Sequence, residues 1–208
     1  MPDHSALRRT DRPINPSTGP LLPRLVNAIL LRREFYEAVA DDQRATGPAG
    51  AIVCIAAIAR ESVGLYALSQ DFQAWGLILL VIVLFAILRW LLYATIMYPI
   101  ARAISGKSFG YKRLLRCLGF AETPAVLTLA AFLVGDQFYA WVQFIVGAWL
   151  LLATIVAVRA ATQVSTPRAV VIGVIGFAAY LGLGLVIDLA TGAPAQPDSG
   201  ALTLRGNV

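Results

Sequence analysis

GKSFGYKRLLRCLGFAETP, residues 106–124, is the one long polar stretch inside an otherwise hydrophobic chain. It lies between two apolar runs and ends in Glu-Thr-Pro at the start of the second run. Apolar side chains recur at helical spacing in its first half, with basic side chains on another face, which predicts a short amphipathic helix at a membrane surface. We expect its basic residues to face lipid or a partner; they are Lys112, Arg113 and Arg116.

The composition is that of a membrane protein. Of the 208 residues, 58% are hydrophobic and 14% are charged, whereas a soluble domain is about 45–50% apolar and about 25% charged. The net charge is +5, but the basic residues cluster at the ends of the apolar runs and form no stripe with interleaved aromatic residues. This pattern excludes nucleic acid as a partner and favours lipid headgroups.

The apolar runs predict an all-α integral membrane protein with five transmembrane helices and cytoplasmic amphipathic helices. Each run approaches the roughly 20 residues that a bilayer requires, and together they fill a membrane domain over 21–190. The expected spans are about 48–68, 76–100, 118–134, 138–158 and 169–189. The run at 118–134 is the shortest, and a re-entrant hairpin is the alternative there. Residues 1–20 and 191–208 are expected to be a disordered and a flexible tail.

Residues 21–40 form a second amphipathic segment. Leu22, Leu25, Val26 and Ile29 recur at helical spacing, while arginine and glutamate side chains occupy other faces. This pattern is typical of a helix that lies in the membrane interface. The alternative is a helix that packs on the cytoplasmic part of the protein itself.

The basic residues predict the orientation of the chain. Of the 17 Lys and Arg residues, only Arg60 and Arg89 fall inside spans, and only Arg205 falls on the side of the C-terminus. The positive-inside rule therefore places the N-terminus in the cytoplasm and the C-terminus outside the cytoplasmic (inner or plasma) membrane. A re-entrant third run would place Arg159 and Arg168 outside, against the rule.

Charged residues inside the apolar runs are candidate functional sites, because each is costly to bury unless it is paired or hydrated. Arg60 and Glu61 lie in the first span and Arg89 lies in the second. Their depths favour a Glu61–Arg89 ion pair, and Arg60 points about 100° away from Glu61. The pair is either part of a polar relay or gated cavity, or a structural pair that sets helix register.

Glu122 is the fourth candidate, at the entry to the third run. It precedes Thr123 and Pro124, and a proline removes a backbone donor and interrupts a helix. Thr123 is expected to cap a restarted helix. Glu122 then faces Arg116, Arg89 or a bound cation, and its role is either a structural break or a functional site.

The sequence contains no signature of an enzyme, a metal site or a cofactor site. Cys54 and Cys117 form no CxxC pair or metal-binding cluster, and His4 is the sole histidine. Phosphate-binding loops, dinucleotide fingerprints and nucleophile elbows are absent. We therefore expect a non-enzymatic protein without cofactor or metal. Two small-xxx-small pairs in the last run, Ala169/Gly173 and Ala178/Gly182, permit close helix packing, either internal or against a second copy.

The layout resembles the Yip family of Ypt/Rab-interacting membrane proteins, and its bacterial-type members in particular. The resemblance rests on LVNAILLRREFYEAVADDQRATGPAG, on GKSFGYKRLLRCLGFAETP and on WLLLATIVAVRAATQVSTPRAV. Positions similar to family motifs are Asp42, Gly47 and Pro48 before the first span, and Gly119, Phe120 and Pro124 at the third. The resemblance implies five spans, a cytoplasmic N-terminus and no enzymatic activity.

These patterns predict a membrane-organising, scaffold or partner-recruiting protein that acts through its two amphipathic helices. Its expected partners are membrane lipids and other membrane proteins or a second copy. The alternative is a small transporter or channel component that uses the intramembrane charged residues Arg60, Glu61, Arg89 and Glu122.

Overall fold

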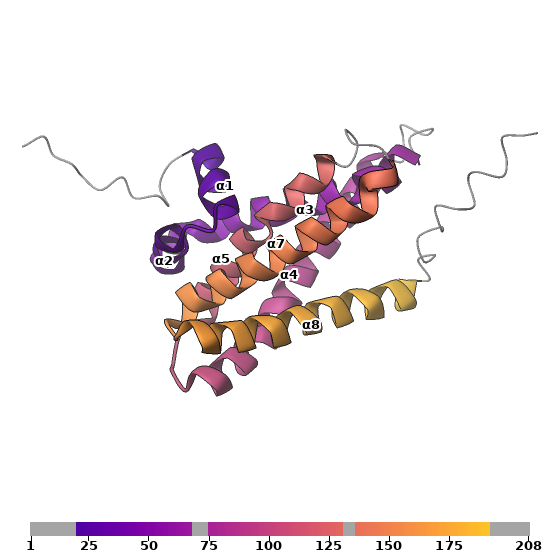
Figure 1. The fold of residues 1–208 in the computed structure, drawn as a ribbon. Helices are drawn as coiled ribbons and strands as arrows, with labels where there is room; N and C mark the ends of the chain where they lie inside the picture. The colour runs from indigo at the N-terminus through magenta and orange to yellow at the C-terminus, as the bar shows by residue number, and fades with distance from the viewer. Residues whose placement is uncertain (1–19, 68–74, 131–135, 192–208) are drawn as a thin grey trace, which may run out of the picture.

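The computed structural model describes residues 20–67, 75–130 and 136–191, and all of its regular elements in these ranges are helices (Figure 1). The tails expected to be disordered or flexible lie outside the described residues, apart from their innermost positions. The elements are α1 (Leu21–Ile29), α2 (Arg33–Asp41), η2 (Gln43–Ala45), α3 (Thr46–Ala67), α4 (Trp75–Ser105), α5 (Tyr111–Ala121), η3 (Thr123–Ala130), α7 (Asp136–Thr162) and α8 (Thr166–Thr191).

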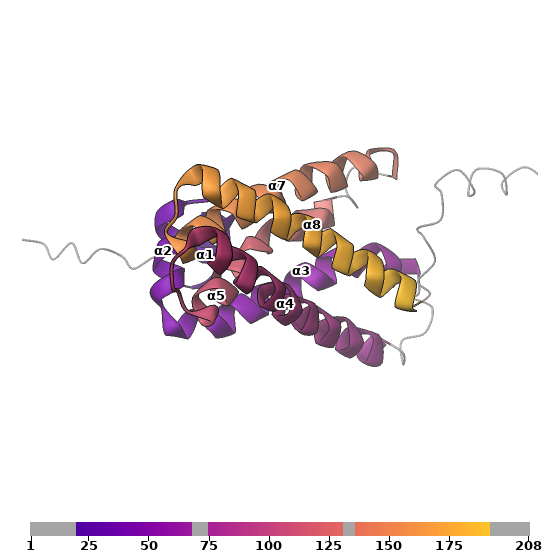
Figure 2. The ribbon, with the colours of Figure 1, turned by 90° about the horizontal axis from the view of Figure 1, so that it is seen from below.

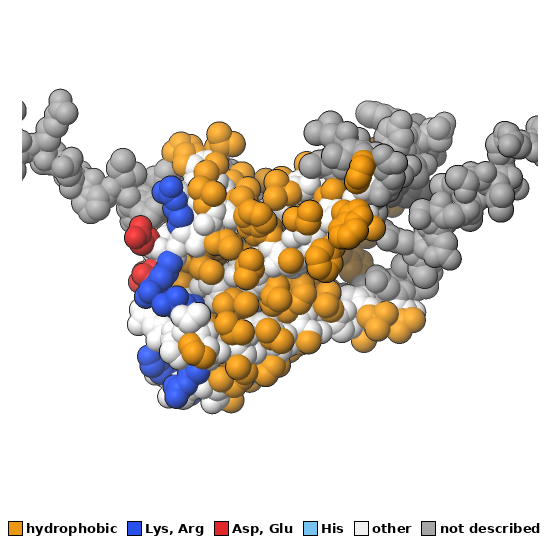
Figure 3. All heavy atoms as spheres, viewed as in Figure 1, with side chains coloured by type: hydrophobic (Ala, Val, Ile, Leu, Met, Phe, Trp, Pro, Cys, Tyr) orange, Lys and Arg blue, Asp and Glu red, His pale blue; other side chains and the backbone are white. Residues whose placement is uncertain are grey.

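Three of the described helices are long and apolar enough to cross a membrane: α4, most of α7 and most of α8. Their outward faces carry large exposed apolar side chains, among them Leu84 at 63%, Phe144 at 70% and Leu185 at 61% exposure. Figure 3 shows this apolar surface along the length of the bundle. An apolar surface of this extent identifies a lipid-facing protein. The predicted all-α membrane class is therefore confirmed.

The described part of the run at 118–134 is two elements, not one helix. It holds the end of α5 and the 3-10 helix η3, which meet at Glu122. Pro124 supplies no amide donor, which favours the end of α5 at this point, although α4 continues through Pro99. Neither α3, which covers the expected span at 48–68, nor the run at 118–134 is among the described helices that qualify as spanning, so a five-span topology stays a prediction.

Most of the charged side chains in the described residues gather at one end of the bundle. Figures 1 and 2 place α1, α2, the α4–α5 connection and the α7–α8 turn at that end, and Figure 3 shows Lys and Arg side chains there. The two connections are tied together, because Lys107 Nζ donates to the Gln163 carbonyl at 2.8 Å. Gly106 and Gln163 both have positive φ, at 63° and 52°. Left-handed residues of this kind end α4 and α7 sharply.

The amphipathic faces of α2 and α5 lie in the protein core. Phe35, Tyr36 and Val39 of α2 are buried, as are Leu114 and Leu118 of α5. The two helices pack against each other and against α7. The segment 21–40, expected as one helix in the membrane interface, is two helices, α1 and α2. The apolar face of α2 packs on the protein, as the alternative had it, and the apolar face of 111–118, expected at the membrane surface, is also in the core.

Glycines allow the closest helix approaches. A Cβ on Gly119 would lie 2.8 Å from Ala49 Cβ of α3 and 3.1 Å from Trp90 of α4, so only glycine fits there without a shift. A Cβ on Gly173 would lie 2.5 Å from Ile155 of α7. The Ala169/Gly173 pair therefore packs internally, whereas a Cβ on Gly182 would meet nothing within 4 Å.

Candidate functional site

An ion pair between α3 and the end of α5 is the centre of the candidate site. Arg60 Nη2 contacts Glu122 Oε2, and the two side chains are only 17% and 13% exposed. Arg60 lies well inside α3, and Glu122 caps the C-terminus of α5. The pair joins elements that are far apart in sequence and lie side by side, since η3 packs along α3.

The break at Thr123-Pro124 places Glu122 in this position. The Glu122 amide donates to the Gly119 carbonyl at 3.3 Å, so α5 ends within a turn. Thr123 Oγ1 donates back to the Phe120 carbonyl at 2.6 Å. The hydroxyl therefore satisfies a terminal carbonyl of α5. A helix restarts here, since η3 begins at Thr123 with Pro124 in its first turn, and the capping role of Thr123 stays a prediction. The side chain of Glu122 is then free to turn toward α3.

The predicted Glu61–Arg89 ion pair is wrong. Glu61 is exposed, and Arg89 lies over the ring of Tyr180, with its Cζ 5.1 Å from the ring centroid. A cation over an aromatic face is stabilised without a carboxylate. Tyr180 also makes an edge-to-face contact with Tyr93, at 5.1 Å between centroids. Arg60 and Glu122 are thus brought together, Arg89 lies on a neighbouring aromatic cluster, and Glu61 does not join them.

A small cavity of about 10 Å³ adjoins Glu122. Its polar lining residues are Glu122, Tyr93, Thr154 and Tyr180. A cavity of this size holds about one water molecule. The site can therefore hydrate the carboxylate, but between these residues it offers no room for a solute.

Sequence reasoning did not identify Tyr93, Thr154 or Tyr180. Each is a polar side chain within a long apolar helix. That composition is the signal that could have found them, since polar groups within spanning helices usually face the bundle interior.

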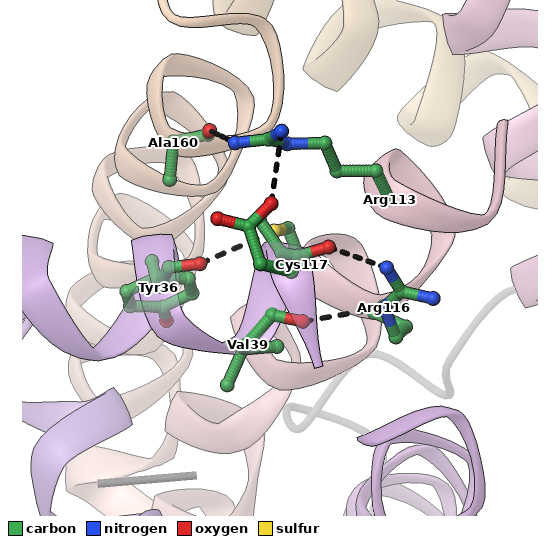
Figure 4. A network of polar contacts seen from close by, with 8 residues as sticks. Tyr36, Val39, Arg113, Arg116, Cys117 and Ala160 are labelled. Carbon is green, nitrogen blue, oxygen red and sulfur yellow. Dashed lines mark hydrogen bonds and ion pairs between the residues drawn. The ribbon is translucent and has the colours of Figure 1, made fainter. Parts of the chain in front are cut away.

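A second polar cluster joins α2, α5 and α7 at the charged end (Figure 4). Arg116 is only 6% exposed, and it donates to the carbonyls of Val39, at 3.2 Å, and of Ala40. Arg113 contacts Asp41 at 2.9 Å and donates to the Ala160 carbonyl at 3.4 Å. Because α2 covers most of its side chain, Arg116 is not exposed at the outer surface, and the expectation that it faces lipid or a partner stays a prediction. Lys112 is exposed.

The thiol of Cys117 lies beneath this cluster. It is fully buried and contacts the Tyr36 carbonyl at 3.6 Å. Burial raises its pKa from 9.0 to about 12, although the nearby guanidinium groups of Arg113 and Arg116 act in the opposite direction. The thiol is therefore protonated and inert in the folded protein at neutral pH.

The family-motif positions support the packing of the charged end. Asp42 caps η2, where its Oδ1 accepts from the Arg44 amide at 2.9 Å. Gly47 and Pro48 lie in the first turn of α3, where proline breaks no hydrogen bond. Phe120 is fully buried, with its ring 5.2 Å from that of Phe35.

Gly119 and Pro124 complete the set of motif positions. Gly119 allows the contact of α5 with α3 and α4, and Pro124 is buried in η3. No side chain at the motif positions contacts the cavity beside Glu122.

Helix α1 leaves one apolar face uncovered. Leu22, Val26 and Leu30 are 73%, 50% and 55% exposed. The C-terminal end of α1 is attached to α7, because Trp149 Nε1 donates to the Ile29 carbonyl at 2.9 Å. Trp149 lies about 15 Å along α7 from Arg159, at about 1.5 Å per residue. The C-terminal end of α1 is therefore attached to α7 about 15 Å from the charged end of that helix, toward the middle of the bundle.

The fold and its surface define an integral membrane protein built as an α-helical bundle. The model of the Yip1 domain family matches residues 27–187, and the chain belongs to that family. No significant match to a curated protein or to a solved structure was found.

Proposed function

We propose that this chain is a non-enzymatic, bacterial-type member of its family that organises the membrane and recruits partners at its charged end. The observation that carries the proposal is the exposed apolar stripe of α1, namely Leu22, Val26 and Leu30. A stripe of this kind on a water-facing helix would be costly, whereas in the acyl region of a leaflet it is stable. The attachment of Ile29 to Trp149 of α7 supports this placement of the stripe.

The proposal includes five crossings of the cytoplasmic (inner or plasma) membrane, with the N-terminus in the cytoplasm and the C-terminus outside. In Figure 1, α3 and the α5–η3 unit run in the same direction, from the charged end toward the opposite end. Such a unit would provide the crossing between α4 and α7. Arg102, Lys107 and Arg168 are exposed at the charged end, which the positive-inside rule assigns to the cytoplasm.

The geometry does not favour the transporter alternative. A solute path along Arg60 and Glu122 would need a continuous cavity, but the space beside Glu122 is about 10 Å³. The exposed stripe of α1 instead provides a contact surface for lipid or for a membrane partner, including a second copy.

The test compares the native complexes of two variants. In the first, the stripe of α1 is made polar by replacing Leu22, Val26 and Leu30 with Ser. In the matched control, Leu84 and Leu185, which are equally exposed on α4 and α8, are replaced with Ser. Both proteins are extracted in native nanodiscs with their surrounding lipid, and their masses and co-extracted proteins are measured by native mass spectrometry.

We expect the α1 variant to insert normally and to lose co-extracted partners that the wild-type and control proteins retain. The proposal is overturned if the wild-type protein carries no partner, or if the two variants lose partners equally. A proteoliposome flux that Glu122→Gln abolishes would instead establish the transporter alternative.

A further inference from the structure

A hollow of about 640 Å³ opens at the charged end of the bundle. It lies between the C-terminal end of α2 and the N-terminal turns of α3 and α5. Three basic residues line it, namely Lys112, Arg113 and Arg116, whereas Asp41 is its only acidic lining residue. The side chains of the hollow therefore carry a net positive charge.

The charge of Arg116 is buried without a carboxylate partner in the described ion pairs. The side chain is 6% exposed, and it donates hydrogen bonds to the carbonyls of Val39 and Ala40. The carboxylate of Asp41 contacts Arg113 instead. A buried charge without a counter-ion is costly. An anion in the hollow would reduce that cost.

The N-terminus of α5 adds to the positive potential. Its N-cap residue is Gly110, which lines the hollow and offers no side-chain oxygen to the first amides of the helix. The N-terminal end of a helix carries a partial positive charge, and its free amides bind phosphate oxygens. Lys112 is exposed in the first turn of α5, where its flexible ammonium group can reach a bound anion.

We propose that this hollow is a binding site for a phosphate group. The phosphate is either that of an anionic lipid headgroup or a free phosphate ion. The lipid source rests on the proposed function, which places this end of the bundle at the cytoplasmic membrane surface, where headgroups are concentrated. The site itself rests on the hollow, on the buried charge of Arg116 and on the uncapped end of α5.

The experiment uses the purified full chain in a neutral detergent and measures binding by isothermal titration calorimetry. Three probes distinguish the sources: dihexanoyl phosphatidic acid, inorganic phosphate, and dihexanoyl glycerol, which lacks the phosphate. Binding of the phosphatidic acid alone identifies a lipid headgroup site. Binding of inorganic phosphate with similar affinity identifies a free phosphate site. Neither outcome depends on the partner complexes measured in nanodiscs, so failure of one proposal is distinguishable from failure of the other.

Variants at exposed lining residues test the location. We expect Lys112→Gln to weaken binding about fivefold, which is the effect of one charge near a solvent-exposed anion. Gln43 also lines the hollow and is exposed, so Gln43→Glu should weaken binding and Gln43→Lys should strengthen it. Arg168→Gln removes an exposed charge at the same end but outside the hollow, and should leave binding unchanged. The proposal is overturned if no phosphate probe binds, if dihexanoyl glycerol binds equally well, if the Gln43 variants do not differ, or if Arg168→Gln weakens binding as much as Lys112→Gln.

Discussion

Replacing Glu122 with Gln tests the energetic role of the ion pair between α3 and α5. The change keeps the size of the side chain and a hydrogen-bond acceptor, but it leaves the charge of Arg60 without its partner. Removing one member of a buried ion pair costs about 3–5 kcal/mol. Because the two side chains are 17% and 13% exposed, we expect a value near the lower limit, about 3 kcal/mol.

This loss is large enough to measure by thermal unfolding. In a chain of this length, each 1 kcal/mol shifts the Tm by roughly 2–4 °C, so about 3 kcal/mol corresponds to a shift of roughly 6–12 °C. Unfolding of the protein in detergent can be followed with a thiol-reactive dye, since Cys117 is fully buried in the folded state. A Cys54→Ser background leaves Cys117 as the only thiol, and a constant scan rate keeps apparent Tm values comparable.

Two comparisons decide the interpretation. Glu61→Gln, at an exposed position one residue from Arg60, should change the free energy of unfolding by no more than about 0.5 kcal/mol. The double variant Arg60→Met/Glu122→Gln buries no unpaired charge and should be more stable than Glu122→Gln alone. The reasoning is refuted if Glu122→Gln has as little effect as Glu61→Gln, or if the two changes in the double variant are additive.

Three further predictions concern helix packing. Gly119→Ala should destabilise the protein by about 1–3 kcal/mol through overpacking, a loss that up to about 1 kcal/mol of gained helix propensity partly offsets. Gly147→Ala, in the interior of α7 with nothing within 4 Å of the added Cβ, should not destabilise it, and equal Tm values for the two variants would contradict this. The Cys117 thiol should resist maleimide in the folded protein at about pH 8, and rapid labelling, as measured by mass spectrometry, would disprove this. Because folding raises the pKa of the thiol from 9.0 to about 12, its contribution to stability is complete below about pH 9 and is lost as pH rises toward 12. A loss of stability at alkaline pH that is the same in Cys117→Ser would disprove this contribution. Trp149→Phe removes the donor to α1 and should speed hydrogen exchange in α1 but not in α2; equal exchange in wild type and variant would argue against the attachment.

The positions of the long helices could be predicted because they depend on local composition. The runs expected at 76–100, 138–158 and 169–189 coincide with α4, α7 and α8, since apolar length alone favours a membrane helix. The break beside Glu122 was also predicted, because Pro124 lacks an amide hydrogen, although the same property of Pro99 does not break α4. The internal contact of Gly173 was one of two alternatives that the small-xxx-small pattern left open.

The partner of each charged residue could not be predicted in this way. Depth along the helices favoured Glu61 for Arg89, but the choice depends on which helices are neighbours and how each is rotated. The contact of Gly119 with Ala49 sets α5 against the start of α3, and this brings Glu122 within reach of Arg60. Arg89 then faces α8, where Tyr180 meets it.

The same limit explains the amphipathic helices. Helical spacing showed that the segments 21–40 and 111–118 each have an apolar face, but an apolar face is stabilised equally well by acyl chains and by a protein core. Only the packing of α2 on α5 decided in favour of the core, and with it the burial of Arg116.

The sequence by itself determined that this protein is a helical membrane bundle of the Yip1 domain family with its basic residues near the ends of its helices, because hydrophobic length, charge position and proline act locally along the chain. Only the tertiary structure decided that Glu122 pairs with Arg60, that Arg116 is a buried charge at the wall of a basic hollow, and that α1, unlike the short helices α2 and α5, keeps an uncovered apolar stripe. These features depend on contacts between residues distant in sequence, and such contacts are set by the fit of whole helix surfaces.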